Sequence, residues 1–378
     1  MKRVALVNPD SKFLVHDGDR PPLGLGYLAT AIRDKHDVQI FDFSIENEKE
    51  LLQRIFNFKP EIIGFTATTP VFYQAVNILN KIKKLHGFDF VSVIGGIQAT
   101  AMPGFCSKYF DYVFTGESEK TFSNFCDGKL NVINNILLAC PQYNIDGVFP
   151  ARDLLPMEKY TMKLDNEICT PLITSRGCPY GCVYCSSILG KKVRSNSADN
   201  IMEEILSIID DYDIKSFYFL DDVFTWDKKR VFDFCKLVKD LSIDIKFRVT
   251  TRIDLVDKRL LEALQRVGCK MVCYGLESGS DRVLQRYNKR FTVQDIKDVV
   301  KLTKSVGIPI KGFWMTSFFE TEADKKMTQD LIQELNLKEN DLYELTIYPG
   351  SKLWRERYGD SQDFDLQYFS NLYHGGKK

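Results

Sequence analysis

Residues 174–185 read TSRGCPYGCVYC, and this stretch decides which fold we expect for the rest of the chain. It places Cys178, Cys182 and Cys185 in a Cys-x3-Cys-x2-Cys pattern. Thiolates are the ligands of iron–sulfur clusters, and three so close in sequence can hold one cluster on a single loop. Three ligands leave one of four irons open, and an open metal position can bind a further molecule. The spacing therefore predicts a [4Fe–4S] site.

A zinc site and a set of buried structural thiols are the alternatives to a cluster at these cysteines. A zinc site normally has four ligands in paired spacings, and neither Cys169 nor Cys235 belongs to a paired motif. Buried structural thiols are the default for isolated cysteines, but Gly and Pro between three closely spaced ones are unusual for that role. An iron–sulfur binding module without enzymatic activity remains an alternative from another functional class.

The composition is that of a globular chain without a charge bias. The chain has 378 residues, of which 44% are hydrophobic, with 51 basic and 51 acidic side chains. This balance gives no general attraction to nucleic acid or to an anionic membrane, and no apolar run approaches the ~20 residues that span a bilayer. We therefore expect a cytoplasmic protein with no membrane span and no nucleic-acid partner, whose cysteines are reduced thiols or metal ligands.

Strand and helix patterns alternate on the C-terminal side of the cysteines. Amphipathic helices are expected at Ala198–Asp211, Lys229–Leu241, Lys258–Val267 and Val293–Val306. The expected strands are Leu172–Ser175, Ser216–Leu220, Ile245–Thr250, Met271–Gly275, Ile308–Trp314 and Leu342–Ile347. Six parallel strands with intervening helices predict an open, partial (β/α)6 barrel, whose chemistry should gather at the carboxyl ends of its strands.

The N-terminal third has the same alternation. Expected strands are Arg3–Val7, Val38–Phe43, Ile62–Thr66, Phe90–Ile94 and Tyr112–Thr115, so we predict an α/β domain with a doubly wound parallel sheet. Any one loop after these strands is accounted for as an ordinary βα turn. Together, the residues at this edge, most of them small or polar, predict a ligand site: Leu23, Gly24, Thr66, Thr68, Gly95, Gly96, Gln98, Ala99, Thr100, Gly116 and Glu117.

These motifs resemble those of a known family. The cysteine motif is similar to that of radical S-adenosylmethionine (SAM) proteins. The order Pro-Pro-Leu-Gly-Leu, Gly-Gly-x-x-Ala-Thr and Gly-Glu-Ser-Glu resembles the cobalamin-binding domain that precedes many of them. The resemblance implies a cobalamin-binding-like Rossmann domain over residues 1–130, a connector over 131–164, a radical SAM partial barrel over 165–350 and a short tail over 351–378. Gln98 stands where the family commonly has His, and no Asp-x-His-x-x-Gly motif is present, so protein His ligation of cobalt is not expected.

The resemblance also implies roles for residues at the ends of the barrel strands. Each of these residues, taken alone, also fits a purely structural role such as a helix cap or a surface charge. The implied SAM contacts are Tyr184 near the adenine, Asp222 near the amino group, Arg252 and Ser278 at the carboxylate, Glu277 at the ribose and Gly312 packed on the adenine. A guanidinium such as that of Arg252 suits bidentate recognition of a carboxylate.

The activity implied by the resemblance uses a [4Fe–4S] cluster, SAM and cobalamin. It is methylation of an unactivated carbon through a 5′-deoxyadenosyl radical and methylcobalamin. The alternative within the family is a rearrangement, ring contraction or cyclisation without methyl transfer. The implied partners are a small-molecule or biosynthetic-intermediate substrate and an external electron donor of the flavodoxin or ferredoxin type. The sequence does not reveal which substrate is used.

Overall fold

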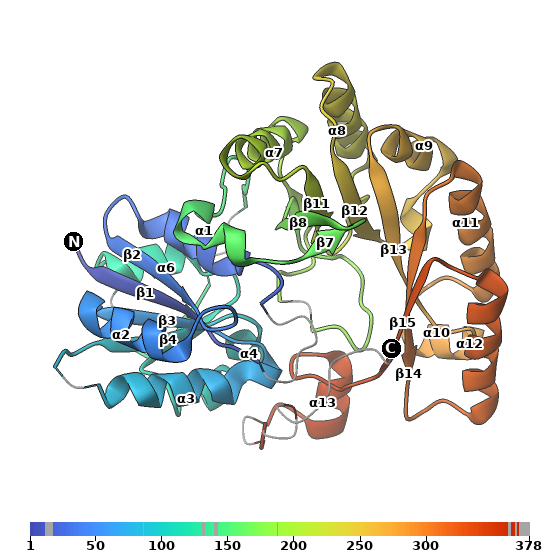
Figure 1. The fold of residues 1–378 in the computed structure, drawn as a ribbon. Helices are drawn as coiled ribbons and strands as arrows, with labels where there is room; N and C mark the ends of the chain where they lie inside the picture. The colour runs from blue at the N-terminus through green and yellow to red at the C-terminus, as the bar shows by residue number, and fades with distance from the viewer. Residues whose placement is uncertain are drawn as a thin grey trace.

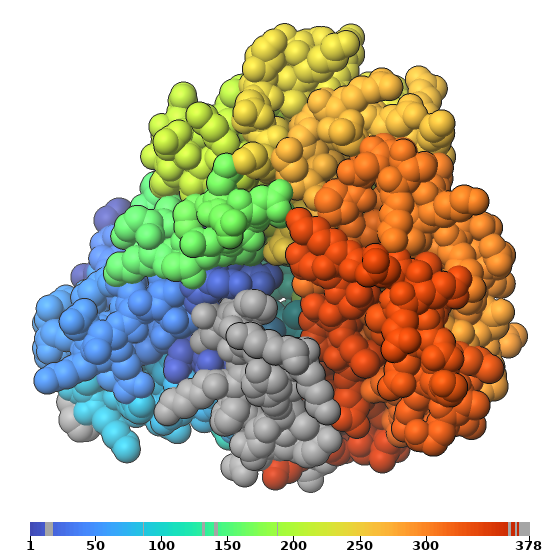
Figure 2. Space-filling model, turned by 45° about the vertical axis from the view of Figure 1, so that its right-hand side comes forward, coloured from blue at the N-terminus to red at the C-terminus, as the bar shows by residue number. Residues whose placement is uncertain are grey.

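The structure is a computed structural model that describes residues 1–11, 18–85, 87–130, 133–139, 143–186, 188–361, 364–366 and 369. Two lobes lie side by side, an N-terminal one and a larger C-terminal one (Figure 1). In the space-filling view, the segment drawn in green reaches from one lobe to the other (Figure 2). The cysteine motif lies where the two lobes meet.

The N-terminal lobe is built on a six-stranded parallel sheet. Its strands are β1 (Arg3–Asn8), β2 (Asp37–Asp42), β3 (Ile62–Thr66), β4 (Val91–Gly95), β5 (Tyr112–Thr115) and β6 (Ile136–Leu138). Their order is β2-β1-β3-β4-β5-β6, so the direction of winding reverses between β1 and β3. The expected doubly wound sheet is confirmed. Its sixth strand lies in the stretch expected to be a connector.

Helices cover both faces of this sheet. One face carries α1 (Leu23–Ile32) and α6 (Glu119–Cys126), and the other carries α2 (Glu48–Phe58) and α3 (Phe72–Lys83). Shorter helices follow β3 and β4, namely η1 (Thr69–Val71), α4 (Ile97–Ala101) and α5 (Pro103–Cys106). Alternate residues of β1 face opposite layers, since successive side chains of a strand point to opposite faces. Leu6 packs with α1 and α6, whereas Val7 packs with α2 and α3.

The C-terminal lobe is the expected partial barrel. Its parallel strands are β8 (Glu167–Leu172), β11 (Ser216–Phe219), β12 (Lys246–Thr251), β13 (Cys269–Glu277), β14 (Ile310–Thr316) and β15 (Glu339–Glu344), with β7 (Lys163–Leu164) antiparallel at the edge. Two expected strands are shifted. The first ends at Leu172 because the chain then forms β9 (Ser175–Arg176), which pairs with β10 (Arg194–Ser195). The last begins at Glu339, where its register with Lys311 is held by an ion pair.

Helices lie along the outer side of the curved sheet (Figure 1). They are α7 (Ala198–Tyr212), α8 (Lys228–Asp240), α9 (Lys258–Arg266), α10 (Asp281–Arg286), α11 (Val293–Val306) and α12 (Glu322–Leu335). Polar side chains cap most of their N-termini, as the helix ends require. Thr292 and Thr321 form capping boxes with the third helical residue of α11 and α12.

The C-terminal segment is packed against both lobes. It forms α13 (Lys352–Tyr358), which was not expected in the polar tail. Leu353 and Trp354 of α13 are buried in the hydrophobic cluster that also contains Phe72 of the N-terminal lobe and Val183 of the cysteine motif. Among the described residues, no helix is both long enough and apolar enough to cross a membrane.

Candidate active site

The cysteine motif lies on one loop between β9 and β10, residues 177–193, which we call the cluster loop. The short antiparallel pairing of Arg176 with Arg194 and of Ser175 with Ser195 closes the base of this loop. Gly177 has φ 96°, and a Cβ there would lie 2.5 Å from the Lys192 carbonyl oxygen. Only glycine fits this turn without strain, so the sequence fixes the start of the loop locally.

Asp221, after β11, anchors the chain as it enters the cluster loop. The residue is 2% exposed, and its carboxylate accepts hydrogen bonds from the backbone N–H groups of Thr174 and Ser175 at 2.7 and 3.0 Å. It also accepts from both hydroxyls, at 2.6 and 2.8 Å. Arg230 of α8 donates to it at 3.4 Å and to the Thr174 carbonyl at 2.9 Å. A carboxylate with this many donors holds its surroundings rigidly.

The three motif cysteines differ from the rest in accessibility. Cys178 and Cys182 are half-buried and Cys185 is exposed. The other described cysteines are all buried: Cys106, Cys126, Cys169, Cys235, Cys269 and Cys273. Among the described residues, no three Cys, His, Asp or Glu side chains converge on a single ion. The ligands of an iron–sulfur cluster bind different irons and have no need to converge, so three accessible thiols on one loop fit such a cluster.

A buried polar cluster forms around Tyr184, whose hydroxyl lies close to Cys182. The Tyr184 hydroxyl donates to Glu277 Oε1 at 2.8 Å, and Lys289 Nζ donates to the same oxygen at 2.9 Å. Lys289 Nζ is also 3.3 Å from the Tyr184 hydroxyl. Burial, the Glu277 carboxylate and Cys182 raise the pKa of Tyr184 well above its usual value, so this hydroxyl keeps its proton and donates. Lys289 was not found from the sequence, where it appears only as one residue in a charged turn.

Arg252 approaches the cluster loop from β12. Its guanidinium is stacked 3.6 Å from the centre of the Tyr180 ring and makes two 2.9 Å hydrogen bonds to Asp254. It also donates to the Lys289 carbonyl at 2.6 Å, while its buried Nη1 has no partner. Burial lowers the pKa of Arg252, but Asp254 outweighs this and raises it, so the cation persists. An unpartnered buried donor is suited to an anionic group of a ligand.

The chain after α10 clamps the middle of the cluster loop. The Tyr287 carbonyl accepts from the Val183 N–H at 3.3 Å, and Asn288 Nδ2 donates to the Gly181 carbonyl at 2.8 Å. Asn288 has φ 61° and Glu277 has φ 67°. Each such conformation costs a non-glycine residue about 1–3 kcal/mol and is typical of functional sites. This clamp is a further feature that sequence reasoning missed.

Other predicted barrel residues lie near this cluster without joining it. Asp222 is exposed beside the start of the loop, and the partial loss of hydration there, together with the neighbouring Asp221, raises its pKa. Ser278 is fully buried, with its hydroxyl 3.1 Å from that of Thr328 in α12. A Cβ at Gly312 would lie 2.7 Å from the Trp314 indole nitrogen, so glycine makes room for that indole. The structure therefore places Ser278 and Gly312 in packing contacts.

In the N-terminal lobe, a mostly apolar cavity of about 190 Å³ lies at the carboxyl ends of the strands. Its position at the reversal between β1 and β3 is where ligands of doubly wound sheets bind. Gly64 of β3 leaves this space open, because a Cβ there would point at Leu6, Val93 and Phe122. Six of the predicted residues line the cavity: Gly24, Thr66, Gly95, Gly96, Gly116 and Glu117. Ile173, Arg176 and Leu189 of the other lobe close it.

The other predicted residues of this edge do not line the cavity. Leu23 and Ala99 are buried, and Thr68 is exposed. The Thr100 hydroxyl accepts from the Gly116 N–H at 2.7 Å and so joins two of the glycine loops. Gln98 is fully buried and accepts from Thr69 at 2.7 Å, with its Nε2 lacking a partner.

A buried ion cluster joins this cavity to the base of the cluster loop. Glu117 Oε2 accepts from Arg176 Nη1 at 3.1 Å and from Arg194 Nη1 at 2.9 Å. Glu119 Oε1 lies 2.6 Å from the same nitrogen of Arg176. Burial lowers the pKa of Arg176, but the two glutamates outweigh this and raise it. All four side chains are at most 9% exposed, so the loop after β5 is bonded directly to β9 and β10.

Comparison with known proteins identifies the family of the chain. The family model described as "Radical SAM superfamily" matches residues 172–332, and that described as "B12 binding domain" matches residues 14–125. A curated relative from Pyrococcus horikoshii, "Uncharacterized methyltransferase PH0819", is 34% identical over 359 residues, which cover 88% of this chain and 78% of that protein. The chain belongs to the cobalamin-binding radical SAM family. It is a radical SAM enzyme by this membership.

Further members of the family differ in the reactions that their names state. The anaerobic magnesium-protoporphyrin IX monomethyl ester cyclase of Rubrivivax gelatinosus is 25% identical, covering 93% of this chain and 69% of the cyclase. Among solved structures, TsrM, a radical SAM methyltransferase from Kitasatospora setae, superposes with a TM-score of 0.77 at 18% identity, covering 94% of this chain and 77% of TsrM. The cobalamin-dependent SAM radical enzyme OxsB superposes with a TM-score of 0.76 at 19% identity, and the superposition covers only 52% of OxsB. At such identities the superpositions establish a shared fold.

Proposed function

We propose that the chain is a cobalamin-dependent radical SAM enzyme that methylates an unactivated carbon. The observation that carries this proposal is the buried ion cluster of Glu117 with Arg176 and Arg194. It joins the glycine-lined cavity of one lobe to the base of the cysteine loop of the other. A reaction that uses two cofactors on one substrate needs them at a fixed separation, and rigid buried bonds between the two sites provide one.

The cluster and SAM would be held by the barrel. We infer that Cys178, Cys182 and Cys185 bind three irons and that SAM binds the fourth. Two groups in the barrel have bonding capacity suited to SAM. The unpartnered Nη1 of Arg252 suits its carboxylate, and the carboxylate of Glu277 suits its ribose hydroxyls. Tyr184, held by Glu277 and Lys289, would lie beside the adenine.

Cobalamin would be held by the edge of the N-terminal sheet. The cavity is mostly apolar and lies at the carboxyl ends of the strands, so it suits the apolar benzimidazole tail of the cofactor. Gly95, Gly96 and Gly116 allow the backbone to approach the rest of the cofactor closely. The fully buried Gln98 supplies no exposed ligand for cobalt.

The side chains of the protein itself hold the bound groups in position. When bound, the cofactors supply a 5′-deoxyadenosyl radical for hydrogen abstraction and a cobalt-bound methyl group for transfer. Glu277 and Lys289 fix the ring of Tyr184, and Arg252 fixes that of Tyr180, so both aromatic side chains of the motif are immobilised. Rings fixed in this way hold a bound ligand in one orientation.

The first experiment measures cofactor content and then products. Full-length protein is purified anaerobically from cells supplied with hydroxocobalamin, and iron and cobalt are measured. We expect about four irons and one cobalt per chain, as one [4Fe–4S] cluster and one cobalamin require. With SAM, a reductant and substrate, S-adenosylhomocysteine and 5′-deoxyadenosine should form together. Formation of 5′-deoxyadenosine with a consumed substrate but no S-adenosylhomocysteine would contradict methylation.

Cyclisation or another rearrangement is the second candidate function. It is favoured by the identity to the Rubrivivax cyclase over 93% of this chain. Such a reaction uses the same two sites without transferring a methyl group, so 5′-deoxyadenosine would accumulate alone. The product ratio therefore separates the two candidates.

The expected organisation and partners complete the proposal. We assign residues 1–130 to the cobalamin-binding-like domain, 131–164 to the connector, 165–350 to the barrel and 351–378 to the C-terminal segment. The substrate is a small molecule or biosynthetic intermediate, nucleic acid is not a partner, and the enzyme works in the cytoplasm. An external electron donor reduces the cluster.

A further inference from the structure

A polar hollow of about 590 Å³ opens beside the cluster loop. One wall is formed by Val183 of that loop, and the others by Phe319 and by side chains of α10 and α13, including Arg282, Arg286 and Lys352. The three cationic side chains are 55%, 49% and 63% exposed. The hollow is therefore open to a partner in solution.

The two helices that form the hollow have an excess of positive charge. Their basic residues are Arg282, Arg286, Lys352, Arg355 and Arg357, and their acidic residues are Asp281 and Glu356. Glu356 of α13 is shared by two of the cations that line the hollow, because it lies 3.3 Å from Arg286 and 3.8 Å from Lys352. The chain as a whole has equal numbers of acidic and basic side chains. A local excess such as this one steers partners of opposite charge.

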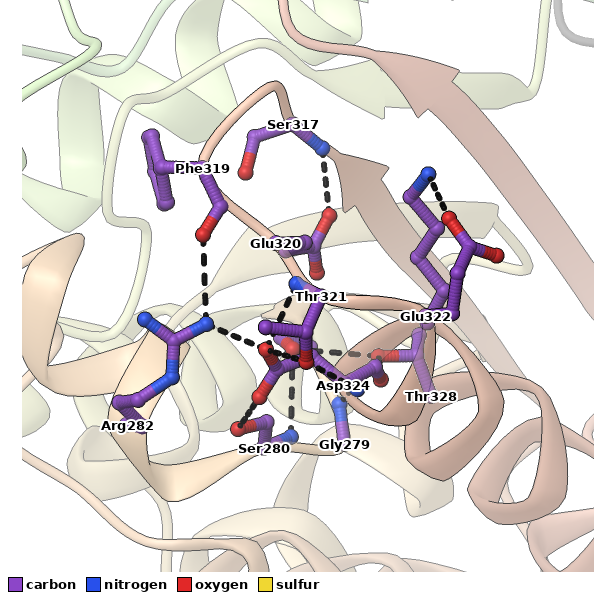
Figure 3. Close-up of polar contacts among 12 residues, drawn as sticks. Gly279, Ser280, Arg282, Ser317, Phe319, Glu320, Thr321, Glu322, Asp324 and Thr328 are labelled. Carbon is purple, nitrogen blue, oxygen red and sulfur yellow. Dashed lines mark hydrogen bonds and ion pairs between the residues drawn. The ribbon is translucent and has the colours of Figure 1, made fainter.

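The position of Arg282 in this hollow is fixed by a hydrogen-bonded network (Figure 3). Its guanidinium donates to the Phe319 carbonyl at 3.2 Å and pairs with Asp324 of α12. Asp324 also accepts from Ser280 at 2.6 Å and from the Thr321 hydroxyl at 2.6 Å. The N-termini of α10 and α12 and the loop after β14 are thus tied together, which gives the hollow a rigid wall.

The residue that follows α10 and the helix α13 are both bonded directly to Val183, one of the two residues between Cys182 and Cys185. The Val183 N–H donates to the Tyr287 carbonyl, at the end of α10, at 3.3 Å. The Leu353 N–H of α13 donates to the Val183 carbonyl at 2.9 Å. Val183 lies between Cys182 and Cys185 and lines the hollow. The stretch of chain that carries Cys182 and Cys185 therefore also borders the hollow.

We infer that this cationic hollow is the docking surface for an acidic one-electron carrier protein of the flavodoxin or ferredoxin type. The inference rests on the proposed function, because it requires a cluster on the cysteine loop. One electron leaves the reduced carrier, which is oxidised by one electron, and enters the cluster, which passes from the 2+ to the 1+ state. No proton or further reactant is needed for this step.

A protein partner suits the site better than a small anion. Phe318, which precedes Phe319 in the sequence, is 64% exposed, and the Arg357 guanidinium lies 5.4 Å from its ring centre. Such an aromatic contact beyond a charged hollow offers apolar area to a second protein surface. Electron-transfer complexes bury little area, less than about 1,200 Å², so a small charged surface is sufficient.

The test compares two charge-reversal variants of the full chain with its cluster. The first variant combines Arg286→Glu with Lys352→Glu and so reverses the charge of the two cations that share Glu356. The matched control combines Lys258→Glu with Arg266→Glu on α9. It reverses the charge of two cations that share Glu262, at 3.9 and 3.7 Å. Reduction of the cluster by an acidic flavodoxin in its hydroquinone form is followed by stopped-flow absorbance and by the EPR signal of the reduced cluster. Photoreduced 5-deazariboflavin serves as a small neutral reductant.

We expect the second-order rate with flavodoxin to fall about tenfold or more in the first variant at low ionic strength, with the difference shrinking at high salt. The control should stay within about twofold, and 5-deazariboflavin should reduce all three proteins alike. Equal rates with flavodoxin for the wild type and the first variant would overturn the inference while leaving the proposed function intact. A chain that assembles no reducible cluster would overturn the proposed function and this inference with it.

Discussion

Replacing Lys289 by methionine tests whether the buried polar cluster beside Tyr184 positions the cluster loop. The Lys289 side chain is 5% exposed and that of Glu277 is 9% exposed, and their charged atoms are 2.9 Å apart. Methionine keeps most of the length of the lysine side chain and removes its charge. The Lys289 carbonyl, which accepts from Arg252, is unchanged. The variant therefore leaves the Glu277 carboxylate buried beside Tyr184 without its cation.

The expected cost follows from burial. Removing one partner of a buried ion pair destabilises a protein by about 3–5 kcal/mol, because the remaining charge keeps its desolvation cost. Solvent screening reduces the contribution of exposed ion pairs to ~1 kcal/mol or less, but it does not apply to side chains as buried as these two. At roughly 2–4 °C per kcal/mol for a domain of about this size, we expect the Tm of the barrel to fall by roughly 6–20 °C.

Differential scanning calorimetry of the full chain without added cofactors measures this loss independently of activity. Lys289→Arg keeps the charge and should stay within a few degrees of the wild type. The double variant Lys289→Met with Glu277→Gln removes both charges and should regain about half of the lost stability or more, since neutral pairs avoid the uncompensated charge. A positioning role also predicts that SAM perturbs the EPR signal of the reduced cluster less in Lys289→Met than in Lys289→Arg, below the Tm of both.

Two results would refute the reasoning. If Lys289→Met unfolds at the temperature of the wild type, the pair with Glu277 contributes nothing to the fold. If the double variant is destabilised by the sum of Lys289→Met and Glu277→Gln, each measured alone, the two residues do not interact. An unchanged SAM response in a destabilised Lys289→Met protein would limit the residue to a structural role.

Three further outcomes are expected. Replacing all three cluster-loop cysteines by alanine should leave iron near zero while cobalt content stays as in the wild type, measured by elemental analysis. Gly24 lines the cavity, and a Cβ there would meet no atom within 4 Å. Gly24→Phe should therefore weaken cobalamin binding at least about tenfold, ~1.4 kcal/mol, whereas Gly24→Ala should retain it; titration with hydroxocobalamin compares them. Arg282 and two hydroxyl donors hold the pKa of Asp324 well below its usual range, so Asp324→Asn should lower the Tm fully above about pH 5 and progressively less below ~pH 4, the ordinary carboxyl pKa.

Local signals account for the parts of the fold that were predicted from the sequence. Helix α11 was expected at Val293–Val306 and is found there, because Thr292 caps its start and Gly307, at φ 84°, ends it. The cysteines were found in the same way, since a cluster motif is compact in sequence. The last barrel strand was displaced because its apolar residues lie past the stretch that pairs with β14. Hydrophobic pattern alone does not fix the ends of an exposed edge strand.

The contacts that surround the cysteines could not be predicted, because they join residues far apart in the chain. Lys289 meets Tyr184 across 105 positions, and Glu117 meets Arg194 across 77. Glu117 was assigned to the cofactor edge from its Gly-Glu-Ser-Glu loop, but the loop does not reveal that its carboxylate is bonded to two arginines. Gln98 illustrates the opposite case, in which a polar residue of a ligand loop turns inward to Thr69. Periodicity gives the layer in which a residue lies, but not its partner in another element.

The buried charges between the lobes contribute more to geometry than to stability. Apolar residues of similar volume often stabilise a protein as much as a buried ion pair does, so stability alone does not explain why Glu117 and Glu119 face Arg176 and Arg194. Apolar surfaces also slide over one another, whereas charged pairs accept one register. Arg176 stands next to Gly177, where the cluster loop begins, and its guanidinium lies 4.6 Å from the ring centre of Tyr27 in α1. One arginine thus fixes the start of the cysteine loop against the wall of the apolar cavity, and any shift between the lobes would break its pairs with both glutamates.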